Sequence, residues 1–381
     1  MRWGVVTALF LSIVGAVWGQ QSDAPASAPP WTLGGSLLVQ PLGAYAAGFS
    51  YGSSTTLGLT FKAGGGRARA EASLEAAVLT GASARLAWAV AGTPYGREDE
   101  LLLPASAPAS GDAALAARVR TMYSKVDMDW IALTVGRQVV NYGRGTLWSP
   151  TDIFTELDLS GISPVRRGTD AVRVTVPLGE TAGVDVVAAP TFSPADGRYS
   201  ARVNALVGDV DVALVAAREG AGRGNPPSTS AGWLFGADFK TDLVVGLTGE
   251  AIYEQPDAGG WGWVRAAAGA DWSIGDFILA AEYYYNGGGV SADLLFPGTH
   301  NLTASVTWTA SEFLLFSLTV IGDLQSAAGT ATLTAQVSAA QNADVTAFLL
   351  AGNGSAGYGI GYGLGGASWA AEAGLGIDVK F

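Results

Sequence analysis

Cysteine is absent from the 381 residues of the chain, and histidine occurs only once. The lack of thiols excludes a disulfide framework and a thiolate metal site, and one histidine is too few for a histidine metal cluster. The formal net charge of −12 argues against a nucleic-acid partner. We therefore expect no cofactor and no nucleic acid.

Charged side chains are also scarce, at 14% of the chain, compared with roughly 25% in an ordinary soluble domain. Hydrophobic residues reach 49%, yet long apolar helices are missing. The longest uncharged stretch beyond the N-terminal region, residues 345–371, is rich in glycine, and each glycine costs a helix interior about 1 kcal/mol. An apolar chain of this kind favours strands as the elements that cross a membrane.

Alternation of apolar and polar residues is what the sequence has instead. In residues 369–381, "WAAEAGLGIDVKF", every second side chain from Trp369 to Phe381 is apolar. Strict alternation puts one set on each face of a β-strand. The pattern recurs in residues 170–178, 300–310 and 329–340, where the second face is mostly small and polar. Lipid outside and a water-filled lumen inside explain both faces.

Connection lengths predict the strand number. Short turns alternate with long connections near residues 80–116, 143–168, 219–230, 287–298 and 353–367, as is typical of outer-membrane barrels. Counting back from the final strand, we predict an all-β fold, a single transmembrane antiparallel β-barrel of about 18 strands over residues 31–381. Sixteen strands is the alternative, because residues 82–92 could be a strand or part of a loop.

The two ends of the sequence carry export signals. Residues 1–19 combine Arg2, an apolar core and a tolerable cleavage site before Gln20, as in a secretory signal. Residues 20–30 are expected to be a flexible periplasmic lead-in. The terminal Phe381 with its alternating apolar residues resembles the C-terminal signal of bacterial outer-membrane proteins, which the barrel-assembly machinery reads. We therefore expect the bacterial outer membrane as the location, with its lipid and that machinery as partners.

One stretch, residues 133–176, carries a more specific motif. It contains Gly136-Arg137-Gln138, then Tyr142-Gly143, a long loop, and an Arg-rich return strand. This arrangement resembles the porin-like outer-membrane barrels related to the alginate-export family. The resemblance implies an outer-membrane channel.

Basic residues gather in the same part of the sequence. The candidate pore-lining residues are Arg118, Arg120, Arg137, Arg144, Arg166, Arg167, Arg173, Asp152 and Asp170. We predict that Arg137 and Arg173, set among valines, point into the lumen with Arg118 and Arg120, where a ladder of guanidinium groups would favour anions. Alternatively, acidic residues of the segment (Asp152, Glu156, Asp158 and Asp170) pair with the arginines and pin an inward-folded loop. The two hypotheses are compatible, because a pinned loop is also a constriction.

The resulting functional expectation is a porin-like channel through which small hydrophilic or anionic solutes, or ions, diffuse passively past an Arg-lined constriction. The alternative is a plugged barrel that acts as a surface binding or adhesion protein. An enzyme is not expected, because His300 is followed by Asn301-Leu302-Thr303, which departs from the His-x-Ser arrangement of outer-membrane phospholipases. The sequence does not set the oligomeric state, and we expect a monomer.

Overall fold

The computed structural model describes residues 31–45, 48–81, 83–84, 109–110, 112–154, 157–158, 165–166, 168–191, 194–220, 231–288, 298–353 and 369–381. The predicted signal (1–19) and lead-in (20–30) lie outside these residues, as do Arg167, Glu156 and most of the 82–92 stretch. No described helix is long and apolar enough to cross a membrane.

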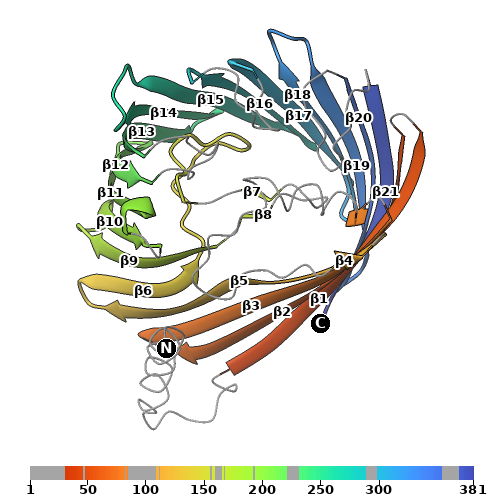
Figure 1. Cartoon of the computed structure of the whole chain (residues 1–381), viewed down its shortest axis with the longest axis horizontal. Helices are drawn as coiled ribbons and strands as arrows, with labels where there is room; N and C mark the ends of the chain where they lie inside the picture. Colours follow the sequence, from red (N-terminus) through yellow and green to blue (C-terminus); the bar gives the residue numbers. More distant parts are fainter. Residues whose placement is uncertain are drawn as a thin grey trace.

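Eighteen of the described strands form one antiparallel barrel (Figure 1). The wall strands are β1 (Trp31–Tyr45), β2 (Phe49–Gly65), β3 (Ala68–Gly81), β5 (Ala113–Met128), β6 (Ile131–Gln138), β9 (Thr169–Pro177), β10 (Ala182–Ala189), β11 (Arg198–Val207), β12 (Val210–Glu219), β13 (Gly232–Asp242), β14 (Gly246–Pro256), β15 (Trp263–Ile274), β16 (Phe277–Asn286), β17 (His300–Ser311), β18 (Leu314–Asp323), β19 (Gly329–Ala340), β20 (Ala343–Asn353) and β21 (Trp369–Lys380). The short β4 (Ala109–Ser110) pairs with β5, while β7 (Leu157–Asp158) and β8 (Val165–Arg166) pair with each other. The predicted fold class is confirmed, with 18 strands rather than 16.

The first and last wall strands close the barrel. β1 pairs with β21, with Leu37 opposite Val379. The seam extends to Phe381, whose N–H donates to the carbonyl of Gly35 (2.9 Å) and whose carbonyl accepts from the N–H of Gly35 (2.8 Å). Because each wall strand has a partner on both sides, the sheet has no free edge, which is the condition for a sheet to cross lipid.

The outer face of the barrel is apolar. On β19, Leu333 and Val337 point outward and are 46% and 41% exposed, whereas Thr332 and Thr334 face inward. Aromatic rings gather near the strand ends: Trp308 stacks on Phe316 at one end (5.6 Å between centroids), and Trp233 stacks on Phe235 towards the other (6.4 Å). An apolar belt with aromatic rings at both rims identifies a membrane-spanning wall.

The two rims of the barrel differ in connection length, as predicted. Short turns such as Gly208–Asp209 and Gly275–Asp276 join strands at the rim where β1 begins and β21 ends. The long connections leave the opposite rim. One of them, between β6 and β9, turns inward after Gln138, and in Figure 1 the yellow segment that follows β6 lies inside the ring of strands.

The seam generates a prediction about Gly35. A Cβ atom there would lie 2.6 Å from the Phe381 ring and 2.8 Å from the carbonyl oxygen of Gly58, whereas a Cβ on the neighbouring Gly34 would meet nothing closer than 3.5 Å. We expect Gly35→Ala to destabilise the folded barrel by about 1–3 kcal/mol, measured as earlier loss of the heat-modifiable form on gels. Gly34→Ala is the matched control. Equal behaviour of the two variants would contradict the role of the Gly35–Phe381 contact.

Candidate functional site

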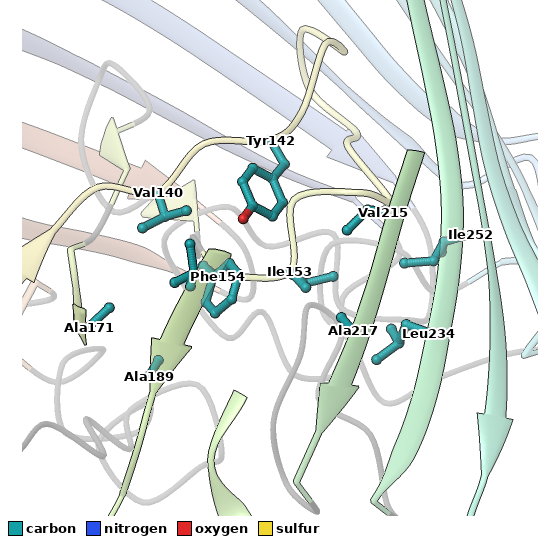
Figure 2. Close-up of a cluster of buried hydrophobic side chains, with 11 residues drawn as sticks. Val140, Tyr142, Ile153, Phe154, Ala171, Ala189, Val215, Ala217, Leu234 and Ile252 are labelled. Carbon is teal, nitrogen blue, oxygen red and sulfur yellow. The ribbon is translucent and has the colours of Figure 1, made fainter. Parts of the chain in front are cut away.

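Residues 139–154 form a segment inside the barrel, called here the lumen loop. Its apolar side chains Val140, Tyr142, Ile153 and Phe154 are buried against the inner wall. The wall contributes Ala171, Val187, Ala189, Val215, Ala217, Leu234 and Ile252, from β9 to β14. Figure 2 shows Val140, Tyr142 and Phe154 grouped with Ala171 and Ala189. The predicted inward folding is thus observed, and burial of apolar surface is its driving force.

The tip of the lumen loop packs further round the wall. Trp148 is 2% exposed and stacks on Tyr284 of β16, with the ring centroids 5.6 Å apart and the planes 14° from parallel. Leu147 and Ile321 of β18 pack against the same cluster. The loop therefore follows the inner wall from β9 as far as β18.

Backbone groups of the lumen loop bond to a wall carboxylate, Glu250 of β14. Its Oε1 accepts from the N–H groups of Arg144 and Gly145, the latter at 2.6 Å. Its Oε2 accepts from both the N–H (3.2 Å) and the hydroxyl (2.7 Å) of Thr151. Glu250 is itself buried, so these hydrogen bonds replace its lost hydration.

A second carboxylate, Glu282 of β16, binds the tip in the same way. It accepts from three successive N–H groups: Thr146 (2.7 Å), Leu147 (3.4 Å) and Trp148 (2.5 Å). Three successive N–H groups can point at one carboxylate only if the backbone turns tightly. The turn requires glycine at position 145, because a Cβ there would lie 2.0 Å from the Trp148 carbonyl oxygen. Glu250 and Glu282 thus satisfy backbone donors that a buried loop would otherwise leave without partners.

Side chains of β11 hold the two stems of the lumen loop together. Tyr142 Oη lies 2.9 Å from Ser200 Oγ, and the Arg202 guanidinium lies 5.1 Å from the centre of the Tyr142 ring. Arg198 donates to the carbonyl of Ile153 (2.7 Å) and stacks over Phe154. Aromatic rings and guanidinium groups combine here into one packed layer.

The structure corrects the prediction for Arg137. Its side chain has no exposed surface; it donates to both carboxylate oxygens of Asp170 (3.0 and 3.1 Å) and to the carbonyl of Val119 (2.9 Å). Val135 faces outward, opposite the exposed Val172. Strict alternation turns Arg137, two residues later, to the same side and not into the lumen. β6 pairs with β5 only as far as Arg137, and the guanidinium bonds to the β5 backbone beyond that point. Arg137 is therefore part of the wall where the loop departs.

The other candidate arginines near the loop are also matched by carboxylates. Arg173 makes two hydrogen bonds of 3.0 Å to Asp185. Arg144 reaches Asp238 (3.0 Å) and Asp211 (2.8 Å), and Asp238 also accepts from Arg202. These contacts correct the expectation of unpaired guanidinium groups beside the loop.

Asp152 joins the lumen loop to the segment that returns to the wall. Its carboxylate bonds to Arg166, and it is almost wholly buried. Burial raises the pKa of Asp152 to about 7, and Arg166 opposes that shift. The hypothesis that acidic residues pin an inward-folded loop is thereby supported by Asp152–Arg166 as well as by Asp170–Arg137.

Arg118 and Arg120 lie on β5, where both approach Glu75 of β3, at 2.6 Å and 3.6 Å. They share one carboxylate on a stretch of wall outside the strands, β9 to β18, that the lumen loop follows. These two residues remain candidates for lining the lumen, whereas Arg167 lies outside the described residues.

Sequence reasoning missed the most important anchors, Glu250, Glu282 and the β11 set Arg198, Ser200 and Arg202. A usable signal existed for the two glutamates. Glu250 in "LTGEAIYEQ" and Glu282 in "LAAEYYY" occupy positions that alternation assigns to the lumen side of their strands. Their neighbours in sequence are small or aromatic residues. A carboxylate at such a position needs a partner from inside the barrel.

The described residues therefore define a membrane-spanning β-barrel with a loop folded into its lumen. In fold the chain is similar to OccAB4 of Acinetobacter baumannii (TM-score 0.59, 7% identity, 94% of this chain and 100% of that chain covered). It is also similar to the outer-membrane protein OprD of Pseudomonas aeruginosa (TM-score 0.56, 10% identity, 94% and 95% covered) and to OpdK of the same organism, solved with vanillate (TM-score 0.58, 10% identity, 92% and 98% covered).

No family model matches the chain, and no curated protein does. At these identities the structural likeness establishes the fold. The relation to alginate-export-type barrels stays a prediction.

The glutamate anchors generate the second prediction. We expect Glu250→Ala and Glu282→Ala each to weaken docking of the lumen loop by on the order of 3 kcal/mol, because several buried N–H groups lose their acceptor. Single-channel recordings should show larger and noisier conductance.

Asp344→Ala provides a control, because this carboxylate contacts Ser338 and Lys380 at the other rim. The anchoring role would be refuted if both glutamate variants conducted like the control and the unmodified protein.

Proposed function

We propose that this protein is a channel of the bacterial outer membrane through which small hydrophilic solutes diffuse passively. The observation that carries the proposal is a closed apolar-belted barrel whose lumen holds a loop anchored by wall carboxylates. A loop fixed in this way narrows the passage without needing an energy source. Export through a signal at residues 1–19 and insertion by the barrel-assembly machinery belong to the same proposal.

The likeness in fold to OprD, OccAB4 and OpdK supports a channel. The distribution of exposure supports a passage along one side of the lumen. Inward-facing residues beneath the loop are buried, such as Val215 (4%) and Ile252 (1%). Six inward-facing hydroxyl side chains of β17–β19 are instead partly exposed: Ser305, Thr307, Ser317, Thr319, Thr332 and Thr334. Solutes would therefore pass between the loop and that opposite wall.

In this proposal the arginines hold the lumen loop and the wall in place, and so set the width of the passage. Arg137, Arg144, Arg166 and Arg173 each bond to a carboxylate, so their positive charge is locally balanced. Closely paired opposite charges present little net field to a passing ion. Among the candidate arginines that the structure describes, Arg118 and Arg120, which share Glu75, would then be the source of an anion preference.

Conductance tests the channel directly. The purified full-length protein reconstituted in a planar bilayer should produce discrete, long-lived open steps. A lumen lined by hydrogen-bonding groups should stay wet and conduct salt. Membranes that remain silent although folded protein has inserted would overturn the proposal and favour a plugged barrel that binds partners at the surface.

The role of the arginine pairs is tested by the double substitution Arg173→Ala with Asp185→Ala. Because this change removes one positive and one negative charge together, we expect noisier conductance while the reversal potential in a salt gradient hardly moves. The matched comparison is Arg118→Ala with Arg120→Ala, which leaves Glu75 in the lumen and should shift preference towards cations. If the first pair of substitutions moved the reversal potential as strongly as the second, the charge of Arg173 would not be balanced by Asp185.

A further inference from the structure

We propose that neutral, polyhydroxylated solutes such as sugars and polyols are the preferred cargo, and that they follow a hydroxyl-lined face of β17, β18 and β19. This inference rests on the proposed channel function and specifies its substrate class. It comes from the part of the inner wall that the lumen loop does not cover.

The hydroxyl face consists of six inward-pointing side chains in two rows. Strand register sets Ser305 opposite Thr319 and Thr319 opposite Thr332. The second row is Thr307, Ser317 and Thr334, again directly opposite one another. All six are partly exposed. Paired positions on neighbouring strands are about 5 Å apart, which makes a regular grid of hydroxyl groups.

The hydroxyl face carries no charge. Strands β17 to β20 contain no Lys, Arg or Glu, and their two aspartates lie at opposite rims: Asp323 ends β18 and Asp344 is near the start of β20. Asp323 is occupied by its own turn, accepting from Gln325 and Ser326. The charged pairs of the described lumen residues stand on other strands: Arg144 and Arg173 bond to carboxylates of β10, β12 and β13, and Arg118 and Arg120 share Glu75 on β3 and β5. Among the described side chains of the hydroxyl face, a solute therefore meets hydroxyls and no charged group.

An aromatic ring continues the second row. Phe348 of β20 lies opposite Thr334 and is partly exposed towards the lumen. Its ring extends over Gly374 of β21, where a Cβ would lie 2.4 Å from a ring carbon. The missing side chain at Gly374 lets the ring lie against the wall. Phe348 thus adds an apolar surface beside the hydroxyl grid.

The lumen loop borders this face. Leu147 and Trp148 at the tip form one cluster with Ile321. On β18, Ile321 is the next inward-facing residue after Thr319, on the side of the long connections. The passage is therefore narrowed where the hydroxyl face begins. A solute entering from the long-connection rim would move from the loop tip onto the hydroxyls.

The chemistry of this face matches sugars better than ions. A hydroxyl both donates and accepts, so a row of them can exchange hydrogen bonds with successive sugar hydroxyls as these leave water. The apolar C–H face of a sugar ring can pack on an aromatic ring such as Phe348. An ion gains less from neutral hydroxyls, and it loses hydration close to a low-dielectric wall.

Solute flux through the unmodified protein gives the first test. Liposomes containing the purified full-length protein should swell faster in a neutral hexose than in the sugar acid or the amino sugar of the same size, by about threefold or more, the equivalent of one hydrogen bond. Swelling that is faster in the sugar acid or the amino sugar, or equal in all three, would overturn the inference while leaving the channel intact. Failure to swell in any solute would overturn the channel proposal itself.

Substitutions locate the path. The triple change Thr307→Val, Thr332→Val and Thr334→Val keeps side-chain shape but removes three hydroxyls, and should lower neutral-hexose flux about threefold with little change in salt conductance. Thr→Ser at the same positions should restore the flux. Thr55→Val is the matched control, because Thr55 pairs with Val39 and Val78 on the outward-facing side of β2.

Loss of hexose flux in the valine variant, with recovery in the serine variant, supports the hydroxyl path. Unchanged hexose flux in the valine variant, or an equal loss in Thr55→Val, contradicts it. If the valine variant does not fold, the serine variant and the three-solute comparison on the unmodified protein still decide the question.

Discussion

Satisfaction of backbone hydrogen bonds is the constraint on which this structure depends. In lipid each N–H and C=O of a strand must find its partner in the neighbouring strand, and only a closed barrel achieves this for all strands. The pairing of β1 with β21 meets that requirement for the wall. The same requirement returns inside the lumen, where a loop without secondary structure is buried. There Glu250 and Glu282 accept its N–H groups, and Arg137 donates to a wall carbonyl.

Because one side of the barrel anchors the lumen loop, the interior has two walls of different composition. One wall, from β9 to β16, supplies apolar surface, carboxylates and guanidinium groups that hold the lumen loop. The other wall, around β17 to β20, meets the tip of the lumen loop at Ile321 and carries neutral hydroxyls. Many of the charged side chains in the described lumen therefore bind the loop or each other, and Arg118, Arg120 and Glu75 lie on a separate stretch of wall. In our proposal, solutes pass along the wall whose described side chains are uncharged.

The fold could be predicted from the sequence because period-two alternation and connection length are local signals that lipid makes strict. The inward loop could be predicted for a similar reason, since Trp148 and Phe154 are too apolar to face water. The anchors could not, because Glu250 and Glu282 lie roughly 100 or more residues from the groups they bind, and no local pattern encodes that distance. Arg137 was misplaced because it lies two residues after Val135, which is opposite the exposed Val172, so alternation does not turn it into the lumen. Its side chain bonds to the backbone of β5 instead.

The seam between the first and last strands also has a consequence for how the barrel forms. Most neighbouring strands are hairpins that close over a few residues, as Val207 does with Val210, whereas Leu37 must find Val379 across nearly the whole chain. Each doubling of the closed length adds about 0.6 kcal/mol of entropic cost, so the seam is the pairing that the chain is slowest to reach unaided. Until it forms, β1 and β21 each expose a row of unpaired backbone groups. The open sheet that exists before the seam closes is therefore the state in which this chain aggregates most readily. The risk depends on how long that state lasts more than on the stability of the finished barrel.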